Sequence, residues 1–224
     1  MIESDCSKSV IFDLDGTLLY TLENLHESTN FALKHFGYKE RSLMEIRSFV
    51  GNGVQKLIER AIPNGLENPN FETCLKIFKE HYSKTMYEKT RPYDCVLDLL
   101  DDLQKRGIKC AVVSNKYDTA VKELCTKYFG DKLTIAVGEN AQVRKKPAPD
   151  SVFAVIKQLG CEGCCIYVGD SEVDLETAKN ANIPCISVSW GYKDREFLVS
   201  HGAEKIADTI QELEKYIKEF FDKL

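Results

Sequence analysis

Apolar residues follow two different patterns along the 224-residue chain. In residues 19–88 they recur at helical spacing, and no segment there alternates like a strand. Before and after this block, short apolar runs alternate with further helical segments, which is typical of an α/β protein. We therefore predict an α/β core from residues 1–18 and 89–224, into which an all-helical block, residues 19–88, is inserted. The predicted helices of this block cover residues 22–36, 42–49, 53–61 and 70–88.

The short apolar runs of the core are typical of buried strands in a parallel sheet. Helical segments separate them, and strands that alternate with helices predict right-handed crossovers. We therefore expect a Rossmann-like, mainly parallel sheet of about five strands. The predicted strands are residues 10–12, 108–113, 133–137, 165–168 and 185–188, and the predicted helices are residues 93–106, 118–128, 150–159, one that ends at 180, a short one after 192, and 209–221.

The first apolar run ends in two carboxylates, Asp13 and Asp15, whose spacing in an extended chain points both side chains to the same side. A carboxylate next to a buried strand is costly unless it is paired or bound to a metal. An ordinary polar turn is the alternative, but it does not explain the position of Asp13. Gly16 supplies the backbone freedom for a sharp turn, and we expect Thr17 to close that turn through a side-chain to backbone hydrogen bond.

Other predicted strands also end in polar residues. Ser114 and Asn115 follow the second strand, and Asp170 follows the fourth, with Asp174 one helical turn further on. A parallel sheet brings these ends to one edge, and Lys146 lies in a loop that two prolines stiffen. Oxygen ligands suit Mg²⁺, and a lysine can neutralise phosphate charge. The set therefore predicts a Mg²⁺-assisted phosphoryl-transfer site.

Four motifs in series resemble those of the haloacid dehalogenase-like (HAD) phosphohydrolase superfamily. The helical block resembles the C1-type cap of that family, and two loops, residues 51–53 and 189–192, resemble its phosphoglycolate phosphatase branch. The similarity covers nearly the whole chain. The four motifs are Asp13-Leu14-Asp15-Gly16-Thr17, Val113-Ser114-Asn115-Lys116, Lys146-Pro147-Ala148-Pro149 and Val168-Gly169-Asp170-Ser171 with Asp174.

The resemblance implies a role for each acidic motif residue. Asp13 would be the nucleophile that forms an aspartyl-phosphate. Asp15 would protonate the leaving alcohol and then activate water. Mg²⁺ would be held by Asp13, by Asp170 and by the backbone carbonyl of Asp15.

The remaining motif residues are expected to bind the substrate or support the site. Ser114 and the backbone amide of Asn115 would hold the phosphoryl oxygens, and Lys146 would neutralise the charge shared by the nucleophile and the phosphate. Asp174 would orient Lys146 or a metal-bound water. The cap loop Gly51-Asn52-Gly53 would face the substrate.

Five other positions bear on the cap and on the fit to the family. Arg47, Lys56 and His26 are weaker candidates for substrate contacts. Tyr20 stands where related sequences often have an aspartate, at the passage from core to cap, so it bears on the hinge and on substrate choice. Asn182 replaces a usual glycine, a change that asparagine tolerates because it adopts the left-handed conformation at a helix end.

We therefore predict a Mg²⁺-dependent phosphatase of a small phosphorylated metabolite, with phosphoglycolate as the leading candidate. Two alternatives on the same scaffold are a β-phosphoglucomutase-like phosphotransferase, which typically has valine in place of Thr17, and an inorganic pyrophosphatase. A non-catalytic binding module would be expected to lack at least one of four residues that are all present, namely Asp13, Asp15, Lys146 and Asp170.

Composition argues against several other classes of protein. The formal charge of −5 speaks against nucleic acid or an anionic membrane as the main partner. No apolar stretch reaches the ~20 residues of a membrane span, and the polar residues 1–5 do not resemble a signal peptide. We therefore expect a cytoplasmic protein. For the oligomeric state we expect a monomer or a homodimer. The odd count of nine cysteines favours reduced thiols, and the cluster of Cys161, Cys164 and Cys165 lacks the second pair of a zinc site.

Overall fold

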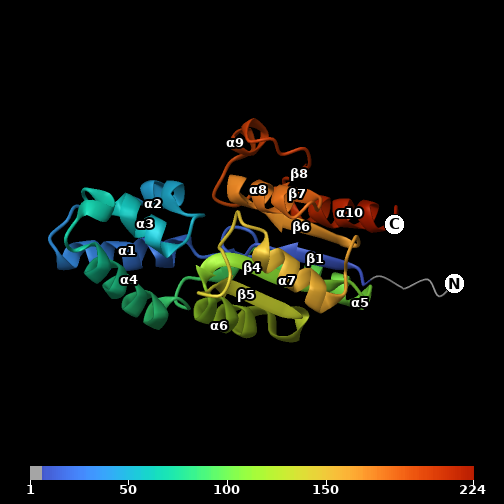
Figure 1. The fold of residues 1–224 in the computed structure, drawn as a ribbon, viewed down its shortest axis with the longest axis horizontal. Helices are drawn as coiled ribbons and strands as arrows, with labels where there is room; N and C mark the ends of the chain where they lie inside the picture. The colour runs from blue at the N-terminus through green and yellow to red at the C-terminus, as the bar shows by residue number, and fades with distance from the viewer. Residues whose placement is uncertain (1–6) are drawn as a thin grey trace.

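Six parallel strands form the central sheet in the computed structural model, which describes residues 7–224. The strands lie in the order β5-β4-β1-β6-β7-β8 (Figure 1). This arrangement confirms the predicted Rossmann-like α/β fold, but the predicted strand count misses the sixth strand, whose two residues are too few to show a pattern. The strands are β1 (Ser9–Phe12), β4 (Lys109–Tyr117), β5 (Ile135–Glu139), β6 (Cys165–Gly169), β7 (Cys185–Val188) and β8 (Ile206–Ala207).

Strand β1 lies at the centre of the sheet, between β4 and β6. Its side chains alternate between two apolar layers, because Val10 and Phe12 pack toward one group of helices and Ile11 toward the other. All three side chains are completely buried. The residues that follow β1 are therefore held in place by neighbours on both sides.

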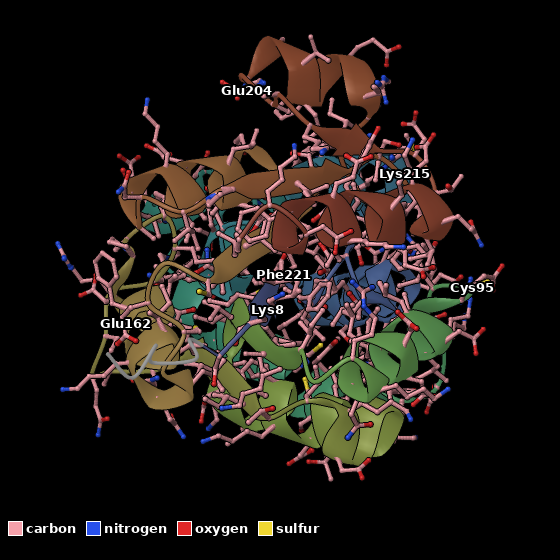
Figure 2. The ribbon with its side chains drawn as sticks, turned by 90° about the vertical axis from the view of Figure 1, so that its right-hand side faces the viewer. Lys8, Cys95, Glu162, Glu204, Lys215 and Phe221 are labelled. Atoms are coloured by element: carbon pink, nitrogen blue, oxygen red, sulfur yellow. The ribbon has the colours of Figure 1, made fainter. Side chains whose placement is uncertain are left out.

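Helices cover both faces of the sheet. The layer of Val10 and Phe12 is closed by α5, α6 and α10, whereas the layer of Ile11 is closed by α7 and α8. Figure 2 views the core from the end opposite the cap, where Lys8 donates to the Phe221 carbonyl at 3.2 Å and ties the end of α10 to the start of the sheet. The helices are α5 (Val96–Lys105), α6 (Asp118–Phe129), α7 (Asp150–Leu159), α8 (Glu172–Asn180), α9 (Arg195–Ser200) and α10 (Ile210–Phe221), with a short 3₁₀ turn at Gly130–Lys132. Asn182 has φ 55° after α8, which confirms the left-handed conformation expected there.

Four helices form the cap at one end of the core (Figure 1). Leu33, Ile46, Ile58 and Phe78, one from each helix, are fully buried among them. The predicted bounds agree to within three residues, and the largest difference is at the end of the fourth helix. The cap helices are α1 (Leu22–His35), α2 (Leu43–Phe49), α3 (Val54–Ala61) and α4 (Phe71–Thr85), with a 3₁₀ turn at Gly65–Glu67.

A two-stranded ribbon, absent from the sequence prediction, joins core and cap. Strand β2 (Leu19–Tyr20) pairs antiparallel with β3 (Arg91–Pro92), so the chain leaves the core and returns at adjacent points. The Arg91 guanidinium lies 4.4 Å from the centre of the Tyr20 ring. The two points at which the chain passes between core and cap lie beside the predicted domain boundaries. The division into residues 1–18 with 89–224 and residues 19–88 stays a prediction. Residues 1–6 lie outside the part of the chain that the structure describes.

Candidate active site

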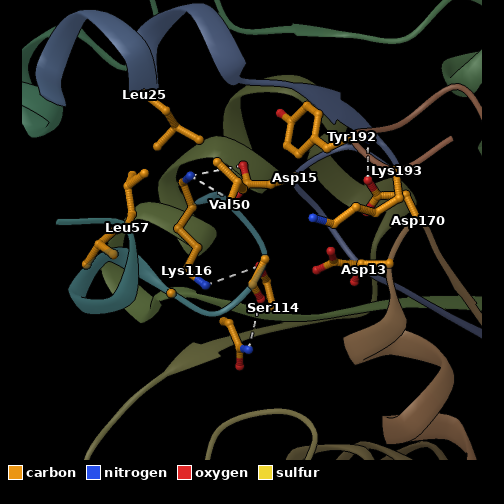
Figure 3. A pocket seen from close by; sticks show the side chains of 15 residues that line it. Asp13, Asp15, Leu25, Val50, Leu57, Ser114, Lys116, Asp170, Tyr192 and Lys193 are labelled. Carbon is orange, nitrogen blue, oxygen red and sulfur yellow. Dashed lines mark hydrogen bonds and ion pairs between the residues drawn. The ribbon is translucent and has the colours of Figure 1, made fainter. Parts of the chain in front are cut away.

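The ends of three neighbouring strands meet at one small cavity beneath the cap (Figure 3). Asp13 follows β1, Ser114 and Asn115 lie near the end of β4, and Asp170 follows β6. The Asp13 amide donates to the Val168 carbonyl at 2.8 Å, which fixes the first carboxylate beside β6. The cavity has a volume of about 40 Å³. The sheet therefore brings together the residues that the sequence places at separate strand ends.

Lys146 is a buried cation shared by two carboxylates. Its ammonium lies 2.8 Å from Asp13 Oδ1, 2.8 Å from Asp174 Oδ1 and 3.0 Å from the Tyr167 hydroxyl. These three partners match the three hydrogens of an ammonium group. Asp174 is fixed in turn because its Oδ2 accepts hydrogen bonds from the backbone amide and hydroxyl of Ser171, at 3.1 and 2.7 Å. Asp174 therefore lies in a fixed position against the Lys146 ammonium.

The acidic side chains have room and charge for a cation. Carboxylate oxygens of Asp13, Asp170 and Asp174 lie within 4.8 Å of one another. With Lys146 as the compensating charge, this buried group keeps an excess of two negative charges, which a divalent ion would offset. Among the hydrogen bonds and ion pairs between described residues, none reaches Asp13 Oδ2 or Asp170 Oδ1. Those two oxygens are therefore available to a ligand, and the donor set fits a hard cation such as Mg²⁺.

Close packing of backbone holds Asp170 in place. The Tyr192 amide donates to Asp170 Oδ2 at 2.6 Å. A Cβ atom on either Gly16 or Gly191 would lie 2.3 Å from the same oxygen, so any side chain at these two positions would displace the carboxylate. Gly16 also has φ 89°, the left-handed region that favours glycine.

Burial and like charge shift the pKa values of this group. Burial raises the pKa of Asp13 to about 7, although Lys146 opposes the shift. Burial, together with Asp174 and Asp13, raises the pKa of Asp170 well above its ordinary value. Burial disfavours the charged form of Lys146, but Asp13 and Asp174 outweigh it and hold its pKa well above the usual range. A bound cation would stabilise the ionised carboxylates.

Asp15 has a second set of partners, which the sequence interpretation misses. Its two carboxylate oxygens lie 3.0 and 2.9 Å from the ammonium of Lys116. The Thr21 hydroxyl donates to Asp15 Oδ1 at 2.7 Å and lies 2.8 Å from the Tyr192 hydroxyl. The sequence feature that points to Lys116 is its place at the end of the second motif. That feature is weak, because lysine side chains are rarely buried.

The turn after Asp15 closes differently from the prediction. The hydroxyl of Thr17 is buried and has no hydrogen-bond partner among the described residues, so the predicted side-chain to backbone bond is wrong. Instead, the Gly16 amide donates to the Leu19 carbonyl at 2.9 Å, and the Leu18 amide donates to the Leu14 carbonyl at 3.0 Å. Backbone bonds alone therefore make this turn.

The cap loop reaches the core at Asn115. Its side-chain amide donates to the Gly51 carbonyl at 3.2 Å, and Gly51 and Gly53 both line the cavity. Asn52 does not line it, and its carbonyl instead accepts from Lys145 at 3.4 Å. Two of the three predicted loop residues therefore face the site.

The weaker cap candidates lie in different surroundings. Arg47 crosses to the core, where it donates to the carbonyls of Tyr192 and Gly191 at 2.8 and 3.0 Å. By contrast, Lys56 pairs with Glu59 and His26 Nε2 bonds the Arg41 carbonyl, all within the cap. Arg47 is thus the one of the three that joins the two parts of the molecule.

Three further findings concern residues 7–224. The carboxylates of Asp13, Asp170 and Asp174 are the only group of three or more candidate metal ligands in this part of the chain, so the cysteine cluster forms no such group. None of the eight cysteines described forms a disulfide. No helix within these residues is long and apolar enough to cross a membrane.

Comparison with known proteins agrees with this site. Residues 10–188 match the family model of haloacid dehalogenase-like hydrolases, and the chain belongs to that family. Phosphoglycolate phosphatases are among its relatives: one from Pseudomonas syringae pv. syringae is 30% identical over 92% of this chain and 78% of its own length. Another, from Mesorhizobium japonicum, is 32% identical over 83% of this chain and 84% of its own length.

Solved structures show the same fold. A crystal structure from Lactobacillus delbrueckii subsp. bulgaricus has a TM-score of 0.90 and 34% identity, covering 95% of this chain and 98% of that one. A predicted phosphoglycolate phosphatase from Haemophilus somnus has a TM-score of 0.86 and 26% identity, covering 94% of this chain and 97% of that one. The family, the relatives and the site together define a phosphatase, whose substrate is a phosphorylated compound.

Proposed function

We propose that this phosphatase is Mg²⁺-dependent and hydrolyses a small phosphorylated metabolite through an aspartyl-phosphate on Asp13. The observation that carries the proposal is the convergence of Asp13, Asp15, Ser114 and Asp170 on one cavity, with Lys146 against Asp13. Nucleophile, acid, phosphate ligand and metal ligand are the parts that phosphoryl transfer needs.

The carboxylates of Asp13 and Asp170 and the backbone carbonyl of Asp15 are the proposed ligands of Mg²⁺. When bound, the ion screens the repulsion between the nucleophile and the phosphate. Asp174 stays outside this set because both of its oxygens already accept hydrogen bonds or an ion pair from the protein.

In the first step, Asp13 attacks phosphorus and the bond to the ester oxygen breaks. Asp15 gives its proton to the leaving oxygen, so an alcohol departs. Ser114 and the Asn115 amide hold the phosphoryl oxygens, and Lys146 balances the negative charge next to Asp13. The product of this step is a phosphorylated Asp13.

In the second step, Asp15 takes a proton from water, which attacks phosphorus and releases inorganic phosphate. Asp13 returns as a free carboxylate, and Asp15 is protonated again for the next cycle. The bonds from Asn115 to the Gly51 carbonyl and from Arg47 to the Tyr192 carbonyl hold the cap against the core, which would limit the access of bulk water to the reacting atoms.

Phosphoglycolate is the substrate that we propose. Relatives of that name cover most of this chain. The cavity is small, about 40 Å³, and the cap contributes apolar side chains such as Leu25, Val54 and Leu57 to its lining, which offer no partners to sugar hydroxyls. Both features disfavour a hexose phosphate.

The test is phosphate release, with and without Mg²⁺, from phosphoglycolate, glucose 1-phosphate, glucose 6-phosphate, pyrophosphate and nucleotides. We expect Mg²⁺-dependent turnover with a preference for phosphoglycolate, and a loss of at least about 10³-fold in Asp13→Asn. The matched control is Asp131→Asn, an exposed aspartate away from the site. Conversion between the two glucose phosphates would identify a mutase instead, and a preference for pyrophosphate would identify a pyrophosphatase.

The covalent step is tested separately with Asp15→Asn. Because this variant lacks the base for the second step, an activated substrate with a good leaving group should leave phosphate on Asp13. Peptide mass spectrometry locates the modification. Phosphate release without any phosphorylated Asp13 in this variant would argue for direct attack by water.

A further inference from the structure

Lys116 is a buried cation that the proposed reaction does not use. Its side chain is 1% exposed, and it lies at the end of β4 with its ammonium on the two oxygens of Asp15. The ammonium also lies 4.7 Å from the centre of the Tyr82 ring, which belongs to cap helix α4. Its position between core and cap, on the wall of the cavity, calls for a role beyond that of a solvated lysine.

The Lys116 side chain lines the same cavity as Asp13 and Asp15, on the side toward the cap. Ser114 and Lys116 are two residues apart on β4, and the Lys116 amide donates to the Ser114 hydroxyl at 3.3 Å. In Figure 3 the Lys116 side chain extends to the cap side of Asp15, toward Leu25 and Leu57, whereas Asp13 lies on the other side of Asp15. A substrate with its phosphorus at Asp13 and its leaving oxygen at Asp15 would therefore place its next atoms near Lys116.

The other cations near the cavity are less suited to meet those atoms of the substrate. Lys146 already has one partner for each ammonium hydrogen. Among the described residues, Lys193 is the second lysine that lines the cavity, but it is half-buried and its ammonium lies 5.1 Å from the centre of the Phe197 ring. Lys116 alone combines complete burial with a single carboxylate partner.

We propose that Lys116 is the specificity-determining residue that recognises a carboxylate on the carbon that carries the phosphate ester oxygen, by exchanging Asp15 for the substrate's carboxylate. This inference rests on the proposed function. The contact with Asp15 is itself a carboxylate bound by both oxygens, so the ammonium already has suitable geometry for that group. The exchange leaves Asp15 with the Thr21 hydroxyl as its partner, next to the leaving oxygen.

A site of this kind rejects neutral analogues. If the far end of the substrate carries no charge, Lys116 stays on Asp15 and the bound state gains no ion pair in the buried cavity. Sites that bury a polar partner for one group discriminate strongly against substrates that lack it. The carboxylate, rather than the length of the substrate, should therefore determine the preference.

The experiment compares phosphoglycolate with 2-hydroxyethyl phosphate, which has the same chain length and a hydroxymethyl group in place of the carboxylate. We expect the wild-type kcat/KM to favour phosphoglycolate by at least about 10²-fold, and Lys116→Met to reduce this preference to below about tenfold. Lys116→Arg, which keeps the charge, should retain most of the preference. Both substrates need Asp15 equally, so their ratio isolates carboxylate recognition from any effect on the acid.

Three outcomes would overturn the proposal. The first is an equal loss on both substrates in Lys116→Met, which would make Lys116 only a partner of Asp15. The second is loss of the preference in Lys193→Met instead, which would place the carboxylate at the rim. The third is a wild-type enzyme that hydrolyses both substrates equally well. This measurement does not depend on the folding of any variant, and such a result would leave the phosphatase function intact. By contrast, a wild-type enzyme that hydrolyses no member of the panel contradicts the proposed function itself.

A binding measurement provides a readout without turnover. In the Asp13→Asn background, calorimetry should detect phosphoglycolate at an affinity about tenfold or more above that of 2-hydroxyethyl phosphate, and adding Lys116→Met should remove the difference. Equal affinities in the Asp13→Asn protein would contradict the proposal.

Discussion

Two buried lysines lie on opposite sides of the same site, and their partners differ. Lys146 has a separate partner for each of its three hydrogens: two carboxylates and the Tyr167 hydroxyl. Lys116 has one carboxylate, Asp15, and an aromatic ring. Lys146 belongs entirely to the core, whereas the ring that faces Lys116 comes from the cap.

This difference separates a fixed charge from an exchangeable one. An ammonium whose three hydrogens are all bonded cannot accept a ligand without losing a partner, so Lys146 serves as a permanent counter-charge to Asp13. Lys116 can give up one carboxylate for another at little cost, since the new ion pair replaces the old one. Each of the following predictions tests one side of this comparison.

The largest effect is expected from Lys146→Met. The change leaves Asp13 and Asp174 without their shared cation, so kcat/KM should fall at least about 10³-fold on phosphoglycolate and on 2-hydroxyethyl phosphate alike. The free energy of unfolding should also fall by about 3–5 kcal/mol, because two buried carboxylates lose their partner. Steady-state kinetics and urea unfolding measure both quantities. The neighbouring Lys145→Met is the control, and a similar loss there would show that the effect is not specific to the buried ammonium.

A smaller effect is expected from Asp174→Asn. This change removes one of the two carboxylate charges that pair with Lys146 and keeps the shape of the side chain. Because residues that orient a catalytic group typically contribute 10–100-fold, kcat/KM should fall by about that factor for both substrates. Glu176→Gln, at an exposed position of the same helix, is the control. If the two variants behave alike, Asp174 does not position Lys146.

Arg47→Met tests the contact between the cap and the loop whose Tyr192 amide holds Asp170. It removes two hydrogen bonds to core carbonyls, so we expect kcat/KM to fall by about tenfold. Arg60→Met is a matched control, because Arg60 donates to the Phe49 carbonyl at 2.7 Å and that bond stays within the cap. This control should alter the free energy of unfolding without a comparable loss of activity. Equal loss of activity in both variants would mean that cap stability, rather than the contact with the core, is responsible.

The smallest effect is expected at Tyr82, whose ring faces the Lys116 ammonium. Tyr82→Phe keeps the ring and should retain the preference for phosphoglycolate over 2-hydroxyethyl phosphate. Tyr82→Leu removes the cation–π contact and should lower that preference by about threefold. Kinetics on the two substrates, with melting temperatures as a check on folding, distinguish the variants. Identical preferences in both would show that the ring does not act on the ammonium.

The parts of the site that the sequence predicts are those set by the sheet. Asp13 and Asp170 each follow an apolar strand and Ser114 lies near the end of one, so a parallel sheet brings all three to its carboxyl edge. The fold class is confirmed for the same reason, because the alternation of strands and helices is local. The roles of these residues as nucleophile and ligands stay predictions.

The parts that the sequence does not predict depend on contacts between distant segments. Lys116 is buried because cap helix α4 places Tyr82 against it, and no pattern around residue 116 contains that information. The partners of Arg47 are 144 and 145 residues away. The Thr17 hydroxyl has the chemistry for the predicted turn bond, but the backbone satisfies that turn without it.

The ribbon of β2 and β3 has a consequence for how such a protein can be altered. Leu19 pairs with Pro92 and Tyr20 with Arg91, so the whole cap is a loop whose two ends already lie side by side. Closing a loop costs little more entropy when the loop grows, and segments with adjacent ends are the ones that chains exchange most readily. The cap is therefore an insert that can be exchanged as a unit. Grafting another cap between these two strands would change the selectivity of the enzyme, whereas the phosphoryl-transfer residues of the core would stay the same.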